Sequence, residues 1–377
     1  MGSIFDFIDW RGDLSLEQAP FKSVDNIILT RLSYLPLDGI VPGPASGEGE
    51  KKAESLSIAD TAKLFAERFS GKSQKKKAKN HNFISKEDPI LLEAVGKSRR
   101  YGSMKLLGFV NQVDPVEEKQ FAALSILTGD KSVFITYRGT DDTLVGWKED
   151  FNMSFYDEIP AQAEAVQYLE TMDKYFKMPI RIGGHSKGGN LGLYAASFCS
   201  KRIRKRIKEI YLNDSPGFNN KVINSEGYQA VKNIIHSYIP EGSVVGMLFE
   251  HTNNHTVIKS RRTGLLQHDS YNWEVSRDEL VKLEEINKGS RFIANTIKDW
   301  MAGLEINQRR DFIEALFTIL YSTEASTFPE IGKDWLKNSI AMLQSFTGLD
   351  NDSRKMLAKT LRVFFRAIKK NIPVLLP

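Results

Sequence analysis

The pattern of apolar and polar positions predicts helices in the first hundred residues. Apolar residues recur three and four positions apart over residues 24–35, 58–69 and 88–104. Residues 39–52 are rich in glycine, proline and polar side chains, which is typical of a loop. A basic run, GKSQKKKAKNHN, separates the second and third helical segments and is typical of a solvated loop. We therefore predict an N-terminal helical segment with a flexible polar loop over residues 1–105.

The middle of the chain alternates between strand-like and helical segments. Runs rich in β-branched and aromatic residues lie at 121–128, 132–139, 178–184, 208–218 and 231–240. The first two runs are separated by Gly-Asp-Lys, which predicts a hairpin. Helical patterns at 158–176 and 190–203 lie between later runs. This alternation predicts an α/β domain on a mainly parallel sheet, which we place at residues 106–275.

The pattern changes again toward the end of the chain. Residues 246–262 contain two short apolar runs that predict a further hairpin. From residue 276 onward, apolar positions follow helical spacing. We therefore assign residues 276–377 to a C-terminal helical region, which is a candidate cap or lid on the middle domain.

Composition and charge set limits on this picture. The chain has 377 residues, 41% hydrophobic and 26% charged, which is typical of a globular protein. Its formal net charge of +5 is too small to indicate a nucleic-acid partner. A single cysteine, Cys199, excludes an internal disulfide and is typical of a reducing compartment. No signal-peptide pattern and no apolar stretch of ~18 residues is present, so we expect a cytoplasmic protein.

A glycine-rich turn follows the strand-like run at 178–184. Its sequence GHSKG fits the pattern G-x-S-x-G, in which a serine lies on a sharp turn from a strand into a helix. The glycines two residues before and after the serine leave room for its strained backbone, and the helix N-terminus favours developing negative charge. This context predicts Ser186 as a nucleophile. The alternative interpretation is a glycine-rich loop without a chemical role.

A serine nucleophile needs a histidine as general base and a carboxylate that orients the histidine. In this kind of arrangement the acid follows the serine in the chain, and the histidine follows the acid. Of the histidines beyond Ser186, His268 is the best placed, because it lies in a loop after the last predicted strands. Asp214 and Glu241 each follow a strand-like run. We rank Asp214 first and keep Glu241 as the alternative; either carboxylate would otherwise cap a turn.

The negative charge that develops during attack on a carbonyl needs two N–H donors, which form an oxyanion hole. The backbone N–H of Lys187, directly after the serine, is one candidate. The segment TYRGTDDT follows an earlier strand, and in it Thr140 offers a backbone N–H and a hydroxyl. The alternative for this segment is an ordinary exit from a hairpin. No metal and no organic cofactor is implied, because the sequence has no His/Cys cluster and no phosphate loop.

Three segments resemble the class 3 lipase-like branch of the α/β-hydrolases, and in particular an uncharacterised bacterial family of such hydrolases. These are YRGTDDTLVGWKEDF (137–151), GGHSKGGNLGLYAA (183–196) and YLNDSPGF (211–218). The resemblance covers residues 1–275. It implies an α/β-hydrolase fold with a mainly parallel central sheet, to which the apolar pattern adds N-terminal and C-terminal helices. It also implies the same serine, histidine and oxyanion residues.

The chain departs from the class 3 pattern at two positions. Class 3 lipases usually have leucine after the nucleophile, where this chain has Lys187. Ser243 stands where the usual acid would lie. The acid is therefore expected to have moved to Asp214 or Glu241.

These features predict a serine hydrolase that cleaves a carboxylic ester through an acyl-enzyme intermediate. The resemblance favours a lipid or another acyl ester as substrate. An acyltransferase or a thioesterase would use the same residues. The alternative from another class is a catalytically silent hydrolase fold that binds lipid or a protein partner.

The last segment with a clear pattern is RKMLAKTLRVFFRAIKKNI, at residues 354–372. Its apolar residues recur at helical spacing, and basic residues occupy the flanks and the opposite face. Such a stripe most often packs on its own protein or on a partner subunit, which is the favoured interpretation. The alternative is peripheral contact with an anionic membrane.

Overall fold

The structure is a computed structural model that describes residues 2–44, 54–69, 85–141, 143–251, 255–323, 344, 345, 348 and 350–375. The basic run predicted to be a solvated loop, and part of the glycine- and proline-rich loop before it, lie outside the described residues.

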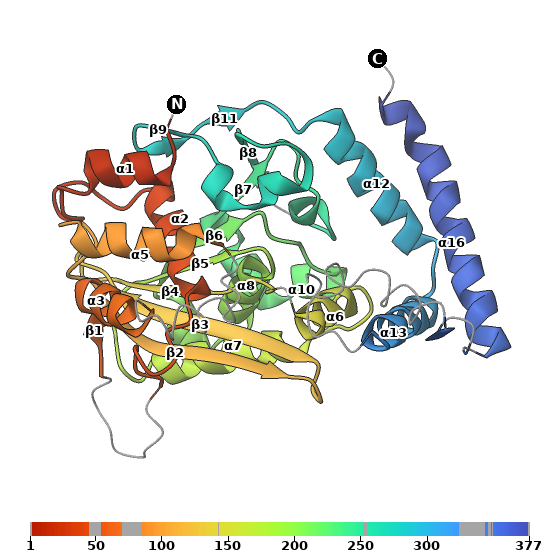
Figure 1. Cartoon of the computed structure of the whole chain (residues 1–377), viewed down its shortest axis with the longest axis horizontal. Helices are drawn as coiled ribbons and strands as arrows, with labels where there is room; N and C mark the ends of the chain where they lie inside the picture. The colour runs from red at the N-terminus through yellow and green to blue at the C-terminus, as the bar shows by residue number, and fades with distance from the viewer. Residues whose placement is uncertain are drawn as a thin grey trace.

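A nine-stranded sheet crosses the described part of the chain, and its strands lie side by side in sequence order (Figure 1). The strands are β1 (Leu56–Ser57), β2 (Lys105–Asp114), β3 (Lys119–Leu127), β4 (Val133–Tyr137), β5 (Ile180–His185), β6 (Ile207–Asn213), β7 (Ile235–Pro240), β8 (Thr256–Ile258) and β11 (Lys282–Leu283). Strands β4 to β8 are parallel, and the outer strands join them in antiparallel fashion. The predicted α/β class with a parallel centre and the predicted hairpin (β3–β4) are confirmed.

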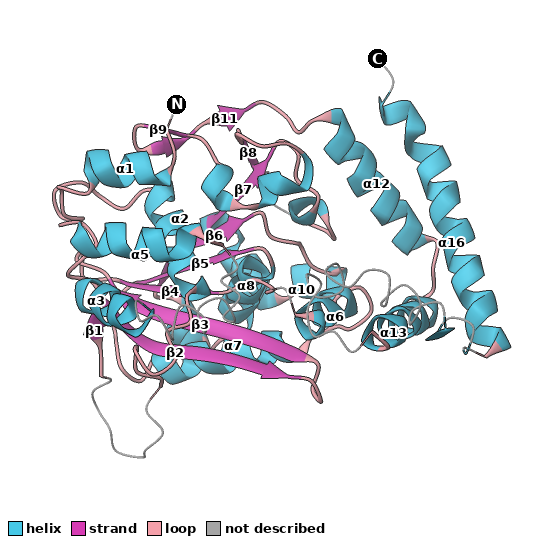
Figure 2. Cartoon of the chain, viewed as in Figure 1, coloured by secondary structure: helices cyan, strands magenta, loops and turns pink. Residues whose placement is uncertain are grey.

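Helices cover both faces of the sheet (Figure 2). One face carries α7 (Pro160–Met172), α8 (Lys187–Phe198), α9 (Lys201–Arg204), α10 (Asn220–Ile223) and α11 (Glu226–Val231). These elements connect consecutive parallel strands, and right-handed crossovers place such connections on the same face. Their apolar side chains form one core with the strands, in which Leu169 and Leu191 pack with Ile135 and Ile182.

The N-terminal helices cover the opposite face. They are α1 (Ile4–Arg11), α2 (Ser23–Arg31), η1 (Leu32–Tyr34), α3 (Ile58–Phe69) and α5 (Glu87–Lys97). Two buried ion pairs hold them together, Arg31 with Asp88 and Arg100 with Asp25, each at 2.6 Å. Burying a charge without a partner is costly, so these pairs fix how the helices sit on the sheet.

Two of the secondary-structure predictions need correction. The hairpin predicted over residues 246–262 is wrong: its first run forms η3 (Val245–Met247) and a bridge between Glu250 and Phe218, and its second run forms β8, which is parallel to β7. The loop after β6 takes the backbone partners that a hairpin would have used. Residues 105–114, which the apolar pattern did not assign, form β2 because they pair along β3.

The helical pattern predicted from residue 276 begins later than expected. Short strands come first, β9 (Val275–Ser276), β10 (Glu279–Leu280) and β11. They are followed by α12 (Lys288–Ala302), α13 (Ile306–Tyr321), α16 (Asn351–Asn371) and η6 (Ile372–Leu375). β11 pairs with β8 at the edge of the large sheet, whereas β9 and β10 pair with each other in a separate two-stranded sheet.

The C-terminal helices pack together beside α6 (Leu144–Asn152), at one end of the sheet (Figure 1). Ile313 and Phe317 of α13 share a small core with Leu144 and Phe155. Trp300 of α12 donates a hydrogen bond from Nε1 to the backbone of α16. Among the helices of the described residues, none combines the length and the apolar character needed to cross a bilayer.

Candidate active site

Ser186 lies on a strained turn between β5 and α8. Its backbone has φ 58° and ψ −136°, a conformation that residues with a side chain rarely adopt. A side chain at Gly184 would collide with the backbone of Gly188, and one at Gly188 would collide with the carbonyl of Tyr137. The backbone N–H of Ser186 donates to Asn213 O at 3.0 Å, which ties the turn to β6. The two glycines are therefore needed for this approach, as the motif indicated.

Asp214 lies at the carboxyl end of β6 and is buried. Its backbone has a positive φ of 49°, which turns the side chain at the end of the strand. One carboxylate oxygen accepts hydrogen bonds from the Ser243 hydroxyl and from the Gly246 N–H, the latter at 3.1 Å. The other oxygen lies 2.6 Å from Nδ1 of His268. Contacts at both of its oxygens thus fix the orientation of the carboxylate.

The structure brings His268 to Asp214 and not to Glu241. Glu241 lies at the end of β7, where its backbone N–H donates to Ile258 O and its carbonyl accepts from Asn287. Ser243 donates its hydroxyl to the Asp214 carboxylate.

His268 ends the short helix η4 (Gly264–His268), and its side chain is 29% exposed. A carboxylate accepts hydrogen bonds, so the hydrogen on Nδ1 is assigned toward Asp214. This leaves Nε2 with a free lone pair, the form of imidazole that accepts a proton. The predicted nucleophile, Ser186, directly follows His185 in the chain. The ring centre of His185 lies 4.5 Å from that of His268.

A buried polar network links the loops around the serine. His185 Nε2 lies 2.6 Å from the carbonyl oxygen of His268, and its Nδ1 lies 2.9 Å from the Tyr34 hydroxyl. That hydroxyl also accepts from the Gly139 N–H at 3.1 Å. Burial, together with the nearby His268, holds the pKa of His185 well below its usual range, and burial raises the pKa of Tyr34 to about 12. Both groups are therefore neutral at neutral pH.

Sequence reasoning missed this network. His185 was visible in the motif itself, directly before the serine, and a role for it was open to prediction. Tyr34 carries no local signal, because it lies 151 residues away in the N-terminal region.

The two candidate oxyanion donors lie on either side of the serine turn. A Cβ placed on Gly139 would come 2.8 Å from the Cβ of Ser186, so the loop that carries Thr140 passes next to the serine. Lys187 is the first residue of α8, and its N–H therefore has no acceptor within the helix. The Thr140 hydroxyl donates to Asp150 at 2.5 Å. Of the two Thr140 donors predicted, the hydroxyl is committed to Asp150, which leaves the backbone N–H.

The side chain of Lys187 is fully buried and points into the protein. Its Nζ lies 2.8 Å from Glu149 and 3.6 Å from Asp150, both on α6. It also donates to the Gln120 carbonyl at 3.1 Å. Burial by itself lowers the pKa of Lys187, but the two carboxylates outweigh burial and raise it above its usual value. Burial raises the pKa of Asp150 to about 6. Lys187 thus binds the serine turn to α6.

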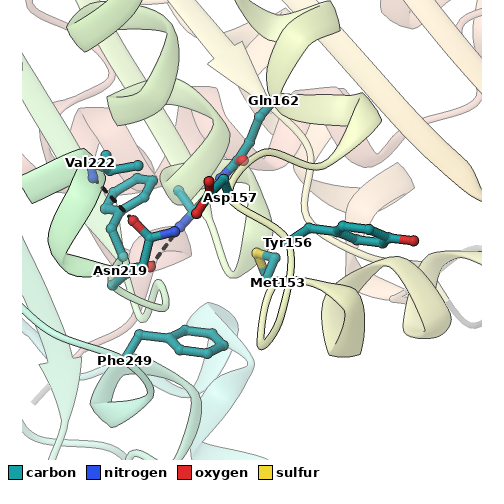
Figure 3. A pocket seen from close by; sticks show the side chains of 10 residues that line it. Met153, Tyr156, Asp157, Gln162, Asn219, Val222 and Phe249 are labelled. Carbon is teal, nitrogen blue, oxygen red and sulfur yellow. Dashed lines mark hydrogen bonds between the residues drawn. The ribbon is translucent and has the colours of Figure 1, made fainter. Parts of the chain in front are cut away.

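A small cleft is lined by the segment after α6, by the helices α7 and α8, and by the loop after Asp214 (Figure 3). Its walls are Met153, Tyr156, Asp157, Gln162, Asn190, Gly217, Phe218, Asn219, Val222 and Phe249. Asn190, on the first turn of α8, donates to the Gly217 carbonyl at 2.8 Å and accepts from Gln162 at 2.8 Å. The cleft is therefore held to both the serine helix and the loop after Asp214.

The order of these elements defines the class of protein. Parallel strands β4 to β8 have helices on both faces, the serine turn follows β5, Asp214 follows β6, and His268 comes after β8. This is an α/β-hydrolase fold. The chain belongs to the Mbeg1-like family, whose family model matches residues 95–318.

Solved structures that are similar to this chain include fungal lipases. A lipase from Rhizopus microsporus var. chinensis is 15% identical, with a TM-score of 0.34, over 58% of this chain and 81% of that chain. The native Rhizomucor miehei lipase propeptide complex is 13% identical, with a TM-score of 0.32, over 60% of this chain and 80% of that chain. A comparison with curated proteins found no match. The assignment of the fold rests on the strand order and direction described above.

Proposed function

We propose that this protein is a serine hydrolase that cleaves carboxylic esters through an acyl-enzyme intermediate. Ser186 is the nucleophile, His268 is the general base, and Asp214 is the acid that orients the histidine. The observation that carries this proposal is the 2.6 Å contact between His268 Nδ1 and the buried Asp214 carboxylate, on loops adjacent to the strained serine turn. A carboxylate in this position holds the imidazole in the form that accepts a proton at Nε2.

The reaction follows from these roles. Ser186 Oγ attacks the carbonyl carbon while His268 Nε2 takes its proton, and the N–H groups of Thr140 and Lys187 stabilise the negative oxygen. The protonated histidine then gives its proton to the leaving alcohol, and the carbonyl re-forms as a serine ester. Water, deprotonated by the same histidine, releases the acid and the free serine.

The class of substrate that we favour is a lipid or another acyl ester. Support comes from the segments that resemble class 3 lipases of a bacterial family, two of which contain Ser186 and Asp214.

The experiment that tests the proposal is labelling with a fluorophosphonate, a reagent that reacts with activated serines. The folded wild type is expected to be labelled, Ser186→Ala to show no labelling, and His268→Ala to react at least roughly 100-fold more slowly, because the serine loses its base. His236→Ala is the matched control, since that side chain is 44% exposed on β7, and it is expected to label like the wild type.

A series of p-nitrophenyl esters of increasing acyl length then ranks the substrates. Faster turnover of thioesters, or transfer of the acyl group to an added alcohol in place of water, would redirect the proposal to a thioesterase or an acyltransferase. A folded wild type without labelling would contradict the proposal and favour a silent hydrolase fold.

A further inference from the structure

The helix α16 has two apolar sides in different surroundings. On the inner side, Leu357 and Ala367 are buried, and Phe364 packs edge-on against Trp300 with ring centres 5.3 Å apart. On the outer side, the exposed fractions are 47% for Leu361, 64% for Phe365, 45% for Ile372 and 45% for Leu375. The apolar stripe in the sequence is therefore divided: one part packs on α12, and the other part is uncovered in the described structure.

The outer apolar residues form a strip along the helix axis. Leu361, Phe365, Ile372 and Leu375 are spaced by four, seven and three residues, which keeps them on the same side of a helix. At 1.5 Å per residue the strip is about 21 Å long. Figure 1 shows α16 at the margin of the molecule, with α12 and α13 on the side toward the sheet. The strip thus lies on the outside, away from the core.

Basic residues border this strip. The basic residues of α16 are Arg354, Lys355, Lys359, Arg362, Arg366, Lys369 and Lys370. With Asp352 as its one acidic residue, the helix carries a net charge of +6, whereas the whole chain carries +5. The net positive charge of the chain therefore comes from this helix, since the rest of the chain has a net charge of −1 (+5 minus +6). Arg362 and Lys369 lie next to the apolar strip, within about 60° of Phe365 around the helix axis.

Most of this charge is not neutralised within the described residues. Lys370 pairs with Asp299 at 2.8 Å. For Lys359, Arg362, Arg366 and Lys369, the described part of the chain places no carboxylate oxygen within 4.0 Å. Their charges are exposed and available to an anionic surface.

We propose that α16 and η6 bind the surface of an anionic lipid bilayer. The outer strip enters the boundary between headgroups and acyl chains, and the basic residues contact lipid phosphates. The helix lies along the surface, since its basic residues do not permit a crossing. Charge favours this occupant over a second copy of the chain, because a dimer through this strip would place two helices of +6 against each other. The inference does not rest on the proposed catalysis.

The test is sedimentation of the full chain with vesicles of phosphatidylcholine, with and without phosphatidylglycerol. The wild type is expected to pellet with the anionic vesicles and to remain in solution with the neutral ones. Binding is expected to weaken at high salt, because about 1 M salt shortens the screening length to about 3 Å. Ser186→Ala is expected to pellet like the wild type, which separates this inference from the fate of the proposed hydrolysis.

Two variants test the strip and its charges separately. Leu361→Ser with Phe365→Ser is expected to lower partitioning about tenfold or more, because both apolar groups leave the interface. The control is Ile90→Ser with Val116→Ser, which are 58% and 92% exposed on other elements, and it is expected to bind like the wild type. A charge variant, Arg362→Gln with Arg366→Gln and Lys369→Gln, reports on the proposal should the first variant fail to fold.

Three outcomes would overturn the proposal. The first is a folded wild type that does not pellet with anionic vesicles. The second is equal binding by the strip variant, the charge variant and the wild type, which would place the contact elsewhere. The third is a wild type that does not pellet and forms, in light scattering, a dimer that the strip variant lacks, which would assign the strip to a second copy.

Discussion

The carboxyl edge of the sheet and the outer side of α16 both carry many ionisable side chains, but they keep them in opposite surroundings. At the sheet edge, Lys187 and Glu149 are fully buried as a pair, and Asp214 is buried against His268. On α16, Lys355 is 79% exposed, and its neighbouring charges are likewise in contact with solvent. A buried charge depends on one partner at a defined distance, whereas exposed charges act through their sum. Single substitutions should therefore have large effects at the sheet edge and small effects on the helix.

The largest effect is expected from Asp214→Asn. Asparagine keeps the shape of the side chain but no longer holds the hydrogen on His268 Nδ1, so kcat for ester hydrolysis should fall by about 10⁴-fold with KM nearly unchanged. Steady-state kinetics on a p-nitrophenyl ester measure both values. Asp269→Asn is the matched control, since that carboxylate accepts from Tyr271 N–H at 3.1 Å and does not contact the histidine nitrogen. A loss of activity in Glu241→Gln but not in Asp214→Asn would contradict the assignment.

The next effect concerns stability. Lys187→Met leaves the buried Glu149 carboxylate without its cation and should lower the free energy of unfolding by about 3–5 kcal/mol. Lys148, which is also on α6, pairs with Glu118 and Glu314, whose side chains are 32% and 49% exposed. Water can replace the lysine there, so Lys148→Met should lower the free energy of unfolding by about 1 kcal/mol. Arg366→Gln on α16 should change the free energy of unfolding by less than about 0.5 kcal/mol.

Urea unfolding of the three variants beside the wild type measures these differences. Equal losses for the buried lysine and for the exposed arginine would remove the contrast between the two regions.

A smaller effect than the loss expected for Lys187→Met is a dependence of stability on pH at the sheet edge. His251 packs against the ring of His255 at 4.4 Å, and its Nε2 is buried with no hydrogen-bond partner in the described residues. Burial, and then the charge of His255, lower the pKa of His251 from 6.5 to about 3. Between these values only the unfolded chain binds the proton, so this contribution to stability is present above pH 6.5 and is lost as the pH falls toward 3.

His251→Gln should therefore make the melting temperature less sensitive to acid. Near pH 4.5 the wild type should lose about 2.7 kcal/mol through this group relative to pH 7.5, and the variant should not. Calorimetry over this pH range measures the slope. An unchanged slope in the variant would show that the proton is taken up elsewhere.

Local patterns predicted the elements around the serine turn well. The β-branched run and the glycines around Ser186 predicted a strand, a sharp turn and a helix, and β5 and α8 have these positions. The prediction succeeded because the signals that it used, the β-branched run and the glycines, lie within about fifteen neighbouring residues. The candidate acid stayed open between Asp214 and Glu241 because both follow strands. In the structure, the positive φ after β6 and the hydroxyl of Ser243 help to hold the Asp214 carboxylate toward His268.

Features that depend on contacts between distant parts of the chain were predicted less well from the sequence. Strand β2 went unassigned because its pairing with β3, and not its own apolar pattern, makes it a strand. The stripe on α16 was visible at helical spacing, but spacing cannot show which of Leu357 and Leu361 faces α12 and which faces outward.

The sequence by itself determined the α/β alternation, the serine turn, the set of candidate residues and the amphipathic last helix, because each depends on neighbouring residues and on backbone propensity. The tertiary structure decided how Tyr34, His185 and His268 join in one buried network, how Lys187 turns inward to α6, and how the apolar stripe of α16 divides between core and surface. These contacts join residues far apart in the chain. They are selected by burial, where a polar group without a partner is costly, and no local pattern records that cost.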